Sequence, residues 1–258
     1  MADLERRFGG VDRVYGASAR RRFERAHVCV IGLGGVGSWA VEALARSAIG
    51  ELTLVDLDHV AESNINRQIQ ATSQTLGLAK GEALRQRIAG INPACRVHLI
   101  DDFITPDNLA DILERGYDHV IDCIDNFRDK AALIAHCRRR RIALFTVGGA
   151  GGMTDPLKLK ITDLSRSRQD PLLARTRKLL RQQYGFPVNP DRRFSVPALW
   201  SEETIVYPDG AGNVTPRKPR GAAASGLNCA GGFGSAVVVT ASFGFAAAAR
   251  VLSRIARN

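Results

Sequence analysis

Short apolar runs alternate with helical patterns over the first 150 residues of the chain. Each run is rich in β-branched residues and spans four or five positions, which is typical of a buried strand. The five predicted buried strands are His27–Ile31, Leu52–Val55, Val97–Ile100, His119–Cys123 and Ala143–Val147. The predicted helices between them are Val36–Ser47, Leu78–Ala89, Asp107–Glu114 and Phe127–Arg139. This alternation predicts an α/β fold with a Rossmann-like, doubly wound parallel sheet and C-terminal elaborations.

The pattern changes after residue 150. We expect a strand over Lys158–Thr162, a basic and partly helical segment from Asp163 to Arg193, and short extended segments over Phe194–Val206, broken by Pro197. Asp209 to Gly226 is rich in Gly, Pro, Ala and basic residues, which predicts a mobile loop. The sequence shows no internal repeat and no interdomain linker.

We therefore predict one domain over residues 1–258. Its parts are a nucleotide-binding core over residues 25–150, a basic and partly mobile elaboration over residues 151–226, and an apolar helix within residues 227–258.

An uncharged stretch from Ala222 to Ala249 allows two interpretations. Its length suits a membrane span. Its many Gly and Ala residues, and polar residues such as Asn228 and Thr240, suit a helix packed inside a protein. We favour a buried helix from about Gly232 to Arg257, and keep attachment to an inner membrane through residues 227–249 as the alternative.

Composition adds a preference for a polyanionic partner. The 258 residues include 36 Lys plus Arg against 26 Asp plus Glu, which gives a net charge of +10. Clusters of basic residues at 138–141, at 217–220 and along 166–193 favour nucleic acid, although a basic protein without such a partner fits the charge as well.

The five cysteines are scattered, never spaced C-x-x-C, and follow no signal peptide. Reduced thiols in a cytoplasmic protein without a zinc site are the simplest interpretation. The five histidines are equally dispersed, and we interpret each as structural or solvated.

A glycine-rich turn joins the first predicted strand to the first helix of the core. Gly32, Gly34, Gly35 and Gly37 lie where backbone N–H groups and a helix N-terminus can hold phosphate oxygens. Such a loop most often binds a dinucleotide, and Asp56, which ends the next strand, could bind ribose hydroxyls.

The residues beyond Asp56 disfavour a dehydrogenase. Asn64, Arg67, Gln68 and Lys80 supply amides and cations that hydride transfer does not need. A triphosphate under nucleophilic attack does need them, because they neutralise charge on phosphoryl oxygens. Asp125, at the end of another strand, could hold Mg²⁺ through oxygen.

These motifs resemble the ubiquitin-activating-enzyme superfamily of ThiF/MoeB-type ATP-dependent adenylyltransferases. The shared motifs are G-x-G-G-x-G-S, V-D-x-D, S-N-x-x-R-Q, G-x-x-K and D-x-x-D-N, all within residues 25–150. The resemblance implies ATP and Mg²⁺ as cofactors and a homodimer. It implies that the nucleotide contacts Gly32, Gly34, Gly35, Gly37, Asp56, Asp58, Asn64, Arg67, Gln68 and Lys80, with Asp125 at the metal and with Arg67, Lys80 and Asp125 as the catalytic residues.

Each of these residues also has an ordinary structural interpretation. Asp56 could cap a turn, Arg67 and Lys80 could be solvated charges, and Asp125 with Asn126 could cap the following helix. Asp122 is left out of the predicted site.

Departures from the wider superfamily narrow the function. The two C-x-x-C pairs of relatives that act on sulfur-carrier proteins are missing, and no cysteine lies between Cys137 and Cys229. We interpret Cys229 as a buried thiol. An arginine that reaches into the partner subunit's ATP site has no clear counterpart, since Arg7 is present but Gly10 stands where a second arginine is expected.

The stretches from Arg7 to Gly16 and from Asn228 to Ser235 resemble the tRNA threonylcarbamoyladenosine dehydratase group. The resemblance implies cyclisation of a modified adenosine in tRNA, after adenylation of its threonyl carboxylate, with a sulfur-transfer protein as a further partner. The alternatives are adenylation of the C-terminus of a sulfur-carrier or ubiquitin-like protein, an NAD-dependent dehydrogenase, and a tRNA- or nucleotide-binding module without turnover.

Overall fold

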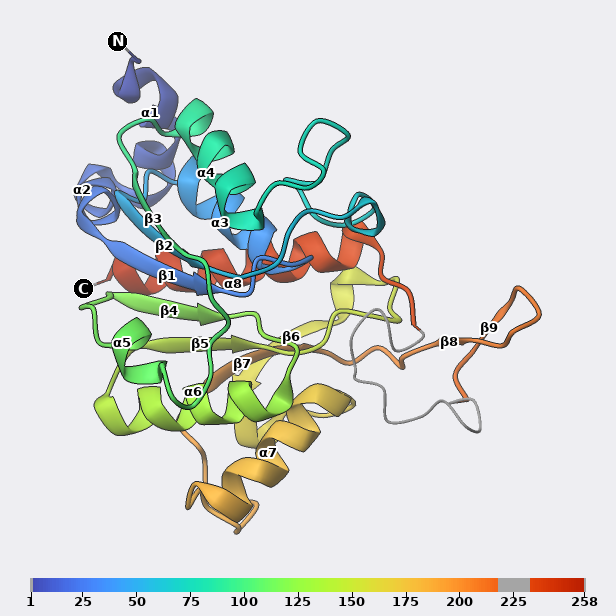
Figure 1. Ribbon diagram of the computed structural model, residues 1–258. Coiled ribbons are helices and arrows are strands. Elements are labelled where there is room, and N and C mark those ends of the chain that lie inside the picture. The colour runs from blue at the N-terminus through green and yellow to red at the C-terminus, as the bar shows by residue number, and fades with distance from the viewer. Residues whose placement is uncertain (1, 218–232, 258) are drawn as a thin grey trace.

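A seven-stranded sheet in the order β3-β2-β1-β4-β5-β7-β6 forms the centre of the molecule (Figure 1). The computed structural model describes residues 2–217 and 233–257. All strands of this sheet run parallel except β6, which pairs antiparallel with β7. The strands are β1 (His27–Ile31), β2 (Glu51–Val55), β3 (Arg96–Ile100), β4 (His119–Asp122), β5 (Leu144–Val147), β6 (Leu159–Asp163) and β7 (Pro197–Ser201).

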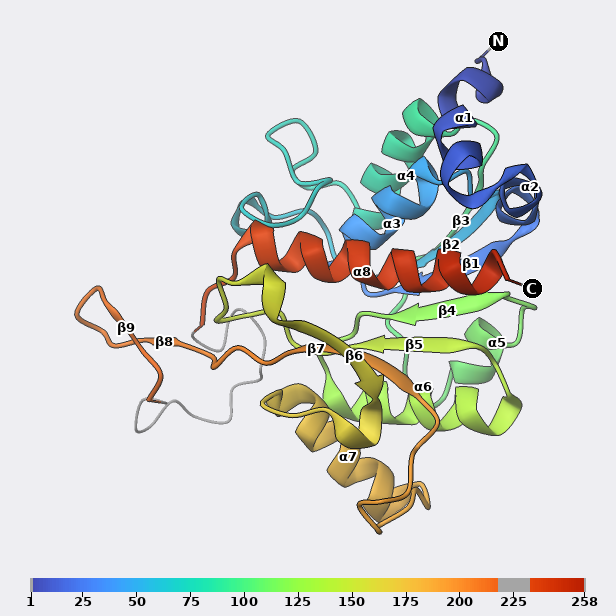
Figure 2. The ribbon, with the colours of Figure 1, turned by 180° about the vertical axis from the view of Figure 1, so that it is seen from behind.

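Helices cover both faces of the sheet, as the alternating pattern predicts (Figures 1 and 2). On one face lie α3 (Gly37–Arg46), α4 (Lys80–Ile91) and α8 (Val237–Ile255), and on the other lie α5 (Leu109–Leu113), α6 (Phe127–Arg140) and α7 (Pro171–Gln183). Alternate residues of each strand enter opposite cores: Val28 and Val30 of β1 pack toward α3 and α8, while Cys29 and Ile31 pack toward α6. The predicted doubly wound α/β fold is confirmed.

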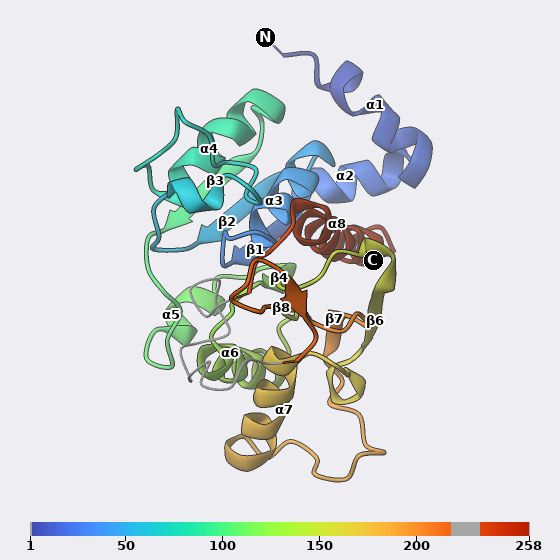
Figure 3. The same cartoon turned by 90° about the vertical axis from the view of Figure 1, so that its right-hand side faces the viewer.

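The carboxyl ends of the parallel strands form one edge of the molecule, which Figure 3 views end-on. The loops that leave this edge include the glycine turn after β1, the long segment between β2 and α4, and the turn between β4 and α6. A small hairpin of β8 (Tyr207–Pro208) and β9 (Val214–Thr215) extends from the same side. The turn of this hairpin and β9 lie in the predicted mobile loop Asp209–Gly226, of which residues 218–226 lie outside the described part of the chain.

Two N-terminal helices were not predicted from the sequence. They are α1 (Leu4–Tyr15), capped by Asp3, and α2 (Ala17–Arg25). Both helices are rich in arginine, and each buries one aromatic residue, Phe8 in α1 and Phe23 in α2. Such sparse apolar spacing hides a helix from a periodicity search.

The strand predicted over Val97–Ile100 is confirmed as β3, but the prediction that it is buried was wrong. β3 lies at the edge of the sheet, and its residues are exposed or half-buried. Its apolar residues gave the same pattern as a central strand because a run of four cannot reveal which strands flank it. Pro197 begins β7 and does not break it, which a proline can do at the first residue of a strand.

Several predicted helix boundaries also differ. The helix predicted over Leu78–Ala89 starts two residues later, at Lys80, and the one predicted over Asp107–Glu114 is confined to Leu109–Leu113. The C-terminal helix starts at Val237, after the extended residue Ala236.

The helix α8 is long and apolar enough to cross a membrane, with a mean hydropathy of 1.3. In the structure it is a helix of the hydrophobic core. Val239, Phe243 and Val251 are fully buried against the sheet and α3. Gly244 brings the two helices close together, because a Cβ there would lie 2.6 Å from the Val36 carbonyl oxygen. The buried-helix interpretation accounts for these contacts.

Candidate functional site

The glycine turn between β1 and α3 is built so that larger side chains do not fit. Gly32 has a φ of +85°, and a Cβ there would lie 2.9 Å from the carbonyl oxygen of Cys123. A Cβ on Gly37 would lie 1.8 Å from the carbonyl oxygen of Gly32. Gly34, by contrast, has no heavy atom within 4 Å of the corresponding position. The turn is therefore tight at its ends and open at Gly34, where a ligand can approach the backbone.

Asp56, at the end of β2, holds this turn in place. Its Oδ2 accepts a hydrogen bond of 2.6 Å from the Leu33 N–H, and its Oδ1 accepts one of 2.9 Å from the Asp58 N–H. Burial raises the pKa of Asp56, and the nearby Lys80 ammonium opposes that rise. The side chain that the sequence analysis assigns to the ribose thus also fixes the glycine turn.

Lys80, the first residue of α4, lies beside the same carboxylates. Its Nζ is 2.7 Å from Oδ2 of Asp58 and 3.9 Å from Oδ1 of Asp56, and its side chain is only 7% exposed. A lysine so buried is not a solvated surface charge, which excludes the ordinary interpretation for Lys80. The Asp58 side chain is 54% exposed, so the ion pair opens toward solvent on one side.

Asn64 and Gln68 lie in the segment between β2 and α4, around the 3-10 helix η1 (Glu62–Asn64). Both side chains are buried, and both use the amide oxygen within the chain. Asn64 Oδ1 accepts from the Ala61 N–H at 3.0 Å, and Gln68 Oε1 accepts from Gln70 Nε2 at 3.0 Å. Their NH₂ groups make no hydrogen bond with the described residues, which leaves two amide donors at this edge.

Gln70 was missed by the sequence analysis. Its Nε2 also donates to the carbonyl oxygen of Leu33 at 3.0 Å, which links this segment to the glycine turn. The sequence marks Gln70 only by its position two residues after Gln68, and two polar residues at this spacing do not form a recognisable motif.

Arg67 lies next to the turn through its aliphatic stem. Its Cγ is 3.4 Å from the position that a Cβ on Gly35 would take. The guanidinium donates to the Ser63 carbonyl at 2.6 Å and to Asn66 Oδ1 at 3.0 Å. The backbone carbonyl of Arg67 accepts from the Trp39 indole at 2.9 Å, which ties the segment to α3.

Asp125 lies on the turn between β4 and α6, which touches the glycine turn at Cys123 and Gly32. Asp125 is exposed, and its carboxylate has no hydrogen bond or ion pair among the described residues. The helix cap is Asn126, whose Oδ1 accepts from the Arg128 N–H at 2.9 Å. The capping interpretation therefore holds for Asn126 and leaves Asp125 free to serve as an oxygen ligand.

Asp122, excluded from the predicted site, is fully buried beneath it. Its Oδ2 lies 2.7 Å from Lys130 Nζ and accepts a 2.6 Å hydrogen bond from Thr146. Its Oδ1 accepts from the Ile124 N–H at 3.0 Å, which shapes the turn that carries Asp125.

A second buried carboxylate supports the other glycine-rich turn, after β5. Asp170 Oδ2 accepts from the Gly149 N–H at 2.9 Å, and its Oδ1 accepts from the Leu173 N–H at the start of α7. Burial raises the pKa of Asp170. The sequence offered no signal for this role because Asp170 lies 21 residues from its partner.

The described cysteines are unsuited to nucleophilic catalysis. Burial raises the pKa of Cys95, Cys123 and Cys137 to about 12 in each case, and it also raises the pKa of Cys29. A thiol with so high a pKa is not ionised near neutral pH. Cys229 lies outside the described residues.

Arg7 is bound within its own chain. Its Nη1 donates to the carbonyl oxygens of Gly90 and Ile91 at 3.0 and 2.8 Å, which caps the C-terminal end of α4.

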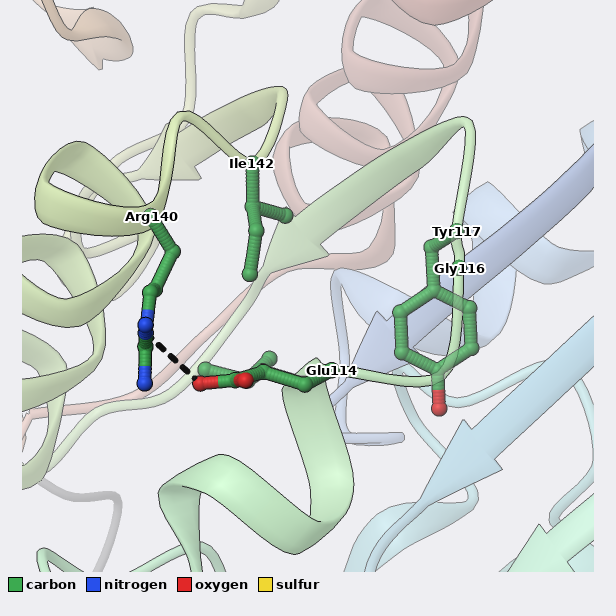
Figure 4. Close-up of a pocket in the computed structure, with 6 residues that line it drawn as sticks. Glu114, Gly116, Tyr117, Arg140 and Ile142 are labelled. Carbon is green, nitrogen blue, oxygen red and sulfur yellow. Dashed lines mark ion pairs between the residues drawn. The ribbon is translucent and has the colours of Figure 1, made fainter.

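A pocket of about 240 Å³ lies away from this site (Figure 4). Glu114, Tyr117 and Arg140 are among its lining residues, and Arg140 Nε lies 2.9 Å from Glu114 Oε1. These residues precede β4 or end α6, at the amino ends of the strands. The pocket is therefore separate from the glycine turn, which lies at the carboxyl ends.

Comparison with known proteins identifies the family of the chain. The chain is 50% identical to the tRNA threonylcarbamoyladenosine dehydratase of Haemophilus influenzae, over 99% of this chain and 95% of that protein. It is 49% identical to the Escherichia coli protein of the same name, over 96% and 93%. The crystal structure of the E. coli enzyme, TcdA, in complex with ATP superposes with a TM-score of 0.87 at 46% identity, covering 98% of this chain and 96% of that one. The ThiF family model matches residues 7–255, and the chain belongs to the ThiF family.

Proposed function

We propose that this chain catalyses the ATP-dependent dehydration of threonylcarbamoyladenosine in tRNA, next to the anticodon. The observation that carries the proposal is the glycine turn held by Asp56 beside Lys80, in a chain half identical over nearly its whole length to a tRNA threonylcarbamoyladenosine dehydratase. The solved relative from E. coli binds ATP and AMP, the substrate and one product expected of an adenylation reaction.

The reaction has two steps. An oxygen of the threonyl carboxylate attacks the α-phosphate of ATP, which forms an acyl-adenylate and releases pyrophosphate. A nitrogen or oxygen of the neighbouring carbamoyl group then attacks the activated carbonyl carbon, loses its proton, and expels AMP. The ring closes with net loss of one water, whose oxygen leaves in AMP and whose protons pass to solvent.

The second step needs no protein nucleophile, because the two reacting groups belong to one molecule and have a high effective molarity. The raised pKa values of the described thiols, which keep them protonated, fit this scheme. The alternative in which a thioester forms on the enzyme lacks an activated thiol among the described residues.

We assign Lys80 and Arg67 to the phosphates as the charges that stabilise the transition state. Asp58 orients Lys80, and Asp56 binds the ribose while it holds the turn. The free NH₂ groups of Asn64 and Gln68 supply neutral donors to phosphate oxygens, and the backbone of Gly32, Gly34, Gly35 and Gly37 surrounds the nucleotide.

The exposed, unpartnered carboxylate of Asp125 suits Mg²⁺, which prefers oxygen ligands and retains several waters. When bound there, the ion would screen charge on the departing pyrophosphate. Asp125 would then be the one protein ligand that we assign to it.

We further propose a cytoplasmic homodimer. Val238 and Phe245 leave part of α8 exposed and apolar, which suits a two-fold contact. A sulfur-transfer protein as a further partner rests on family resemblance alone. Attachment to a membrane through α8 rests on the hydropathy of that helix alone, and we prefer the homodimer to both.

One assay tests the function. The purified protein is incubated with ATP, Mg²⁺ and tRNA that bears threonylcarbamoyladenosine, and the nucleosides are analysed by mass spectrometry. The proposal predicts loss of one water from the modified adenosine, with one AMP formed per product. ATP turnover that depends on a small carrier protein would favour the alternative function, adenylation of the C-terminus of a sulfur-carrier or ubiquitin-like protein. An unchanged nucleoside without AMP formation would contradict the proposal.

A further inference from the structure

A cluster of metal-binding residue types lies at the amino ends of β1, β2 and β3, the end opposite the glycine turn. His27 begins β1, Glu51 begins β2, and His98 is the third residue of β3. In the sheet register His27 lies opposite Glu51, and His98 lies opposite Thr53. Since alternate residues of a strand share a face, all three side chains lie on the same face of the sheet.

The ligand atoms of these residues converge. His98 Nε2 lies 2.7 Å from Glu51 Oε1, and His27 Nδ1 lies 3.7 Å from the same oxygen. All three atoms lie within 4.8 Å of one another. Ligand atoms around one tetrahedral zinc ion lie about 3.4 Å apart, given bond lengths of about 2.1 Å. His98 Nε2 is therefore closer to Glu51 Oε1 than two ligands of one ion would be, and His27 Nδ1 is slightly farther from it. A small shift of the half-exposed His98 side chain away from Glu51 would open the space for the ion.

The side chains around the cluster orient it. Thr53 Oγ1 lies 2.8 Å from Nε2 of His27, which leaves Nδ1 of that ring facing Glu51. The Tyr117 ring packs edge-on against the His27 ring, with centroids 4.7 Å apart. Arg96 pairs with Oε2 of Glu51, which leaves Oε1 facing the histidines. Such partners of the ligands fix tautomer and direction in metal sites.

We propose that His27, Glu51 and His98 bind a divalent transition-metal ion of the zinc class. Two imidazoles and one carboxylate suit Zn²⁺, Cu²⁺ or Ni²⁺ better than Mg²⁺ or Ca²⁺, which prefer oxygen alone. Water fills the remaining coordination positions, because the His98 side chain is 49% exposed and the site is open to solvent.

The proposed ion joins the edge of the sheet to its centre. β3 pairs with β2 along only one side, and its residues are exposed or half-buried. An ion held by three adjacent strands binds the folded state alone, so it stabilises the fold by mass action. This role is independent of the nucleotide chemistry at the opposite edge.

Zn²⁺ titration of the full-length, untagged protein tests the proposal. The titration is followed by calorimetry in nucleotide-free buffer, because ATP itself binds the metal. We expect one ion per chain, and loss of that binding in His98→Ala and in Glu51→Gln. His136→Ala is the matched control, since His136 forms its own ion pair with Glu114 at 3.1 Å elsewhere on the molecule. Asp125→Ala separates the cluster from the proposed Mg²⁺ residue.

Two further measurements sharpen the result. Thr53→Val keeps all three ligands but removes the partner of His27, so we expect it to weaken Zn²⁺ binding about 10- to 100-fold. Saturating Zn²⁺ should raise the melting temperature of the wild-type protein and leave that of His98→Ala unchanged. Equal binding by the wild type and His98→Ala, or binding lost in His136→Ala instead, would overturn the assignment.

Discussion

Lys130 and Asp122 form an ion pair in which Nζ lies 2.7 Å from Oδ2 and neither side chain is exposed to solvent. Thr146 donates to the same carboxylate oxygen at 2.6 Å. The pair joins the end of β4 to the first turns of α6, directly beneath the turn that carries Asp125. A structural charge pair thus supports the loop of the candidate active site.

Removing one member of this pair should be costly, since the other charge remains buried. We expect Lys130→Met to lower the free energy of unfolding by about 3–5 kcal/mol. Urea unfolding measures this loss, and Lys178→Met, at an exposed lysine of α7, serves as the control. A loss below 1 kcal/mol would mean that the pair contributes little to the fold.

Lys80 is expected to act on ATP. Its Nζ lies beside the carboxylates of Asp58 and Asp56, next to the glycine turn. Lys80→Ala therefore removes a positive charge from the proposed phosphate site and leaves the packing of the apolar core intact. We expect ATP–pyrophosphate exchange in the presence of substrate tRNA to fall below detection, with tRNA binding retained. Asp58→Asn should slow exchange to a smaller degree. Full exchange by the Lys80→Ala protein would remove Lys80 from the mechanism.

The end and the middle of the glycine turn should respond differently to a methyl group. A Cβ on Gly37 would lie 1.8 Å from the Gly32 carbonyl oxygen, whereas Gly34 is open. We expect Gly37→Ala to destabilise the fold by about 1–3 kcal/mol through overpacking, and Gly34→Ala to leave folding stability unchanged. Thermal unfolding of both proteins checks this contrast, which equal melting temperatures would contradict.

Two arginines beside the site are candidates for contact with the tRNA backbone. Phe127 is the first residue of α6, two residues after Asp125. The guanidinium carbons of Arg128 and Arg175 lie 5.1 and 5.9 Å from the centroid of its ring. Neither forms an ion pair among the described residues, although the charge of Arg128 acts on the neighbouring Asp129. We expect each Arg→Ala change to lower the slope of log affinity against log salt by about 1 and to leave ATP binding intact.

Arg46→Ala provides the control for tRNA binding, because Arg46 pairs with Glu42 at 2.7 Å on α3. A salt slope that falls equally in this protein would show that the effect follows net charge and not the surface around Phe127.

Acid should destabilise the protein through His119. Burial lowers the pKa of His119 to about 4, and Arg250 and Arg254 of α8 add to that shift. Above about pH 6.5, the usual histidine pKa, the ring is neutral in the folded and the unfolded state, so it does not change the free energy of unfolding. As the pH falls toward 4, the unfolded chain takes up a proton that the folded chain does not, and the folded state loses about 3 kcal/mol.

The comparison of wild type with His119→Gln isolates this effect. Chemical unfolding at several pH values should show a steeper loss between pH 6.5 and 4 in the wild type. Parallel profiles would show that other groups carry the acid sensitivity.

Local patterns in the sequence determined the sheet-and-helix order, because apolar runs and their spacing reflect which face each segment buries. They also determined the glycine turn, since positive φ and close approach need glycine at Gly32 and Gly37. Lys80 and Asp56 could be assigned to one site because the carboxyl ends of parallel strands meet at one edge.

Other features depended on which residues the strand register and the helix packing bring together. The edge position of β3, the buried Asp122–Lys130 pair and the role of Asp170 join residues that no local pattern connects. His27 and His98 are interpreted singly as dispersed histidines, yet the pairing of β1, β2 and β3 places them around Glu51. Contacts between distant segments depend on long-range packing, and only the tertiary structure contains that information.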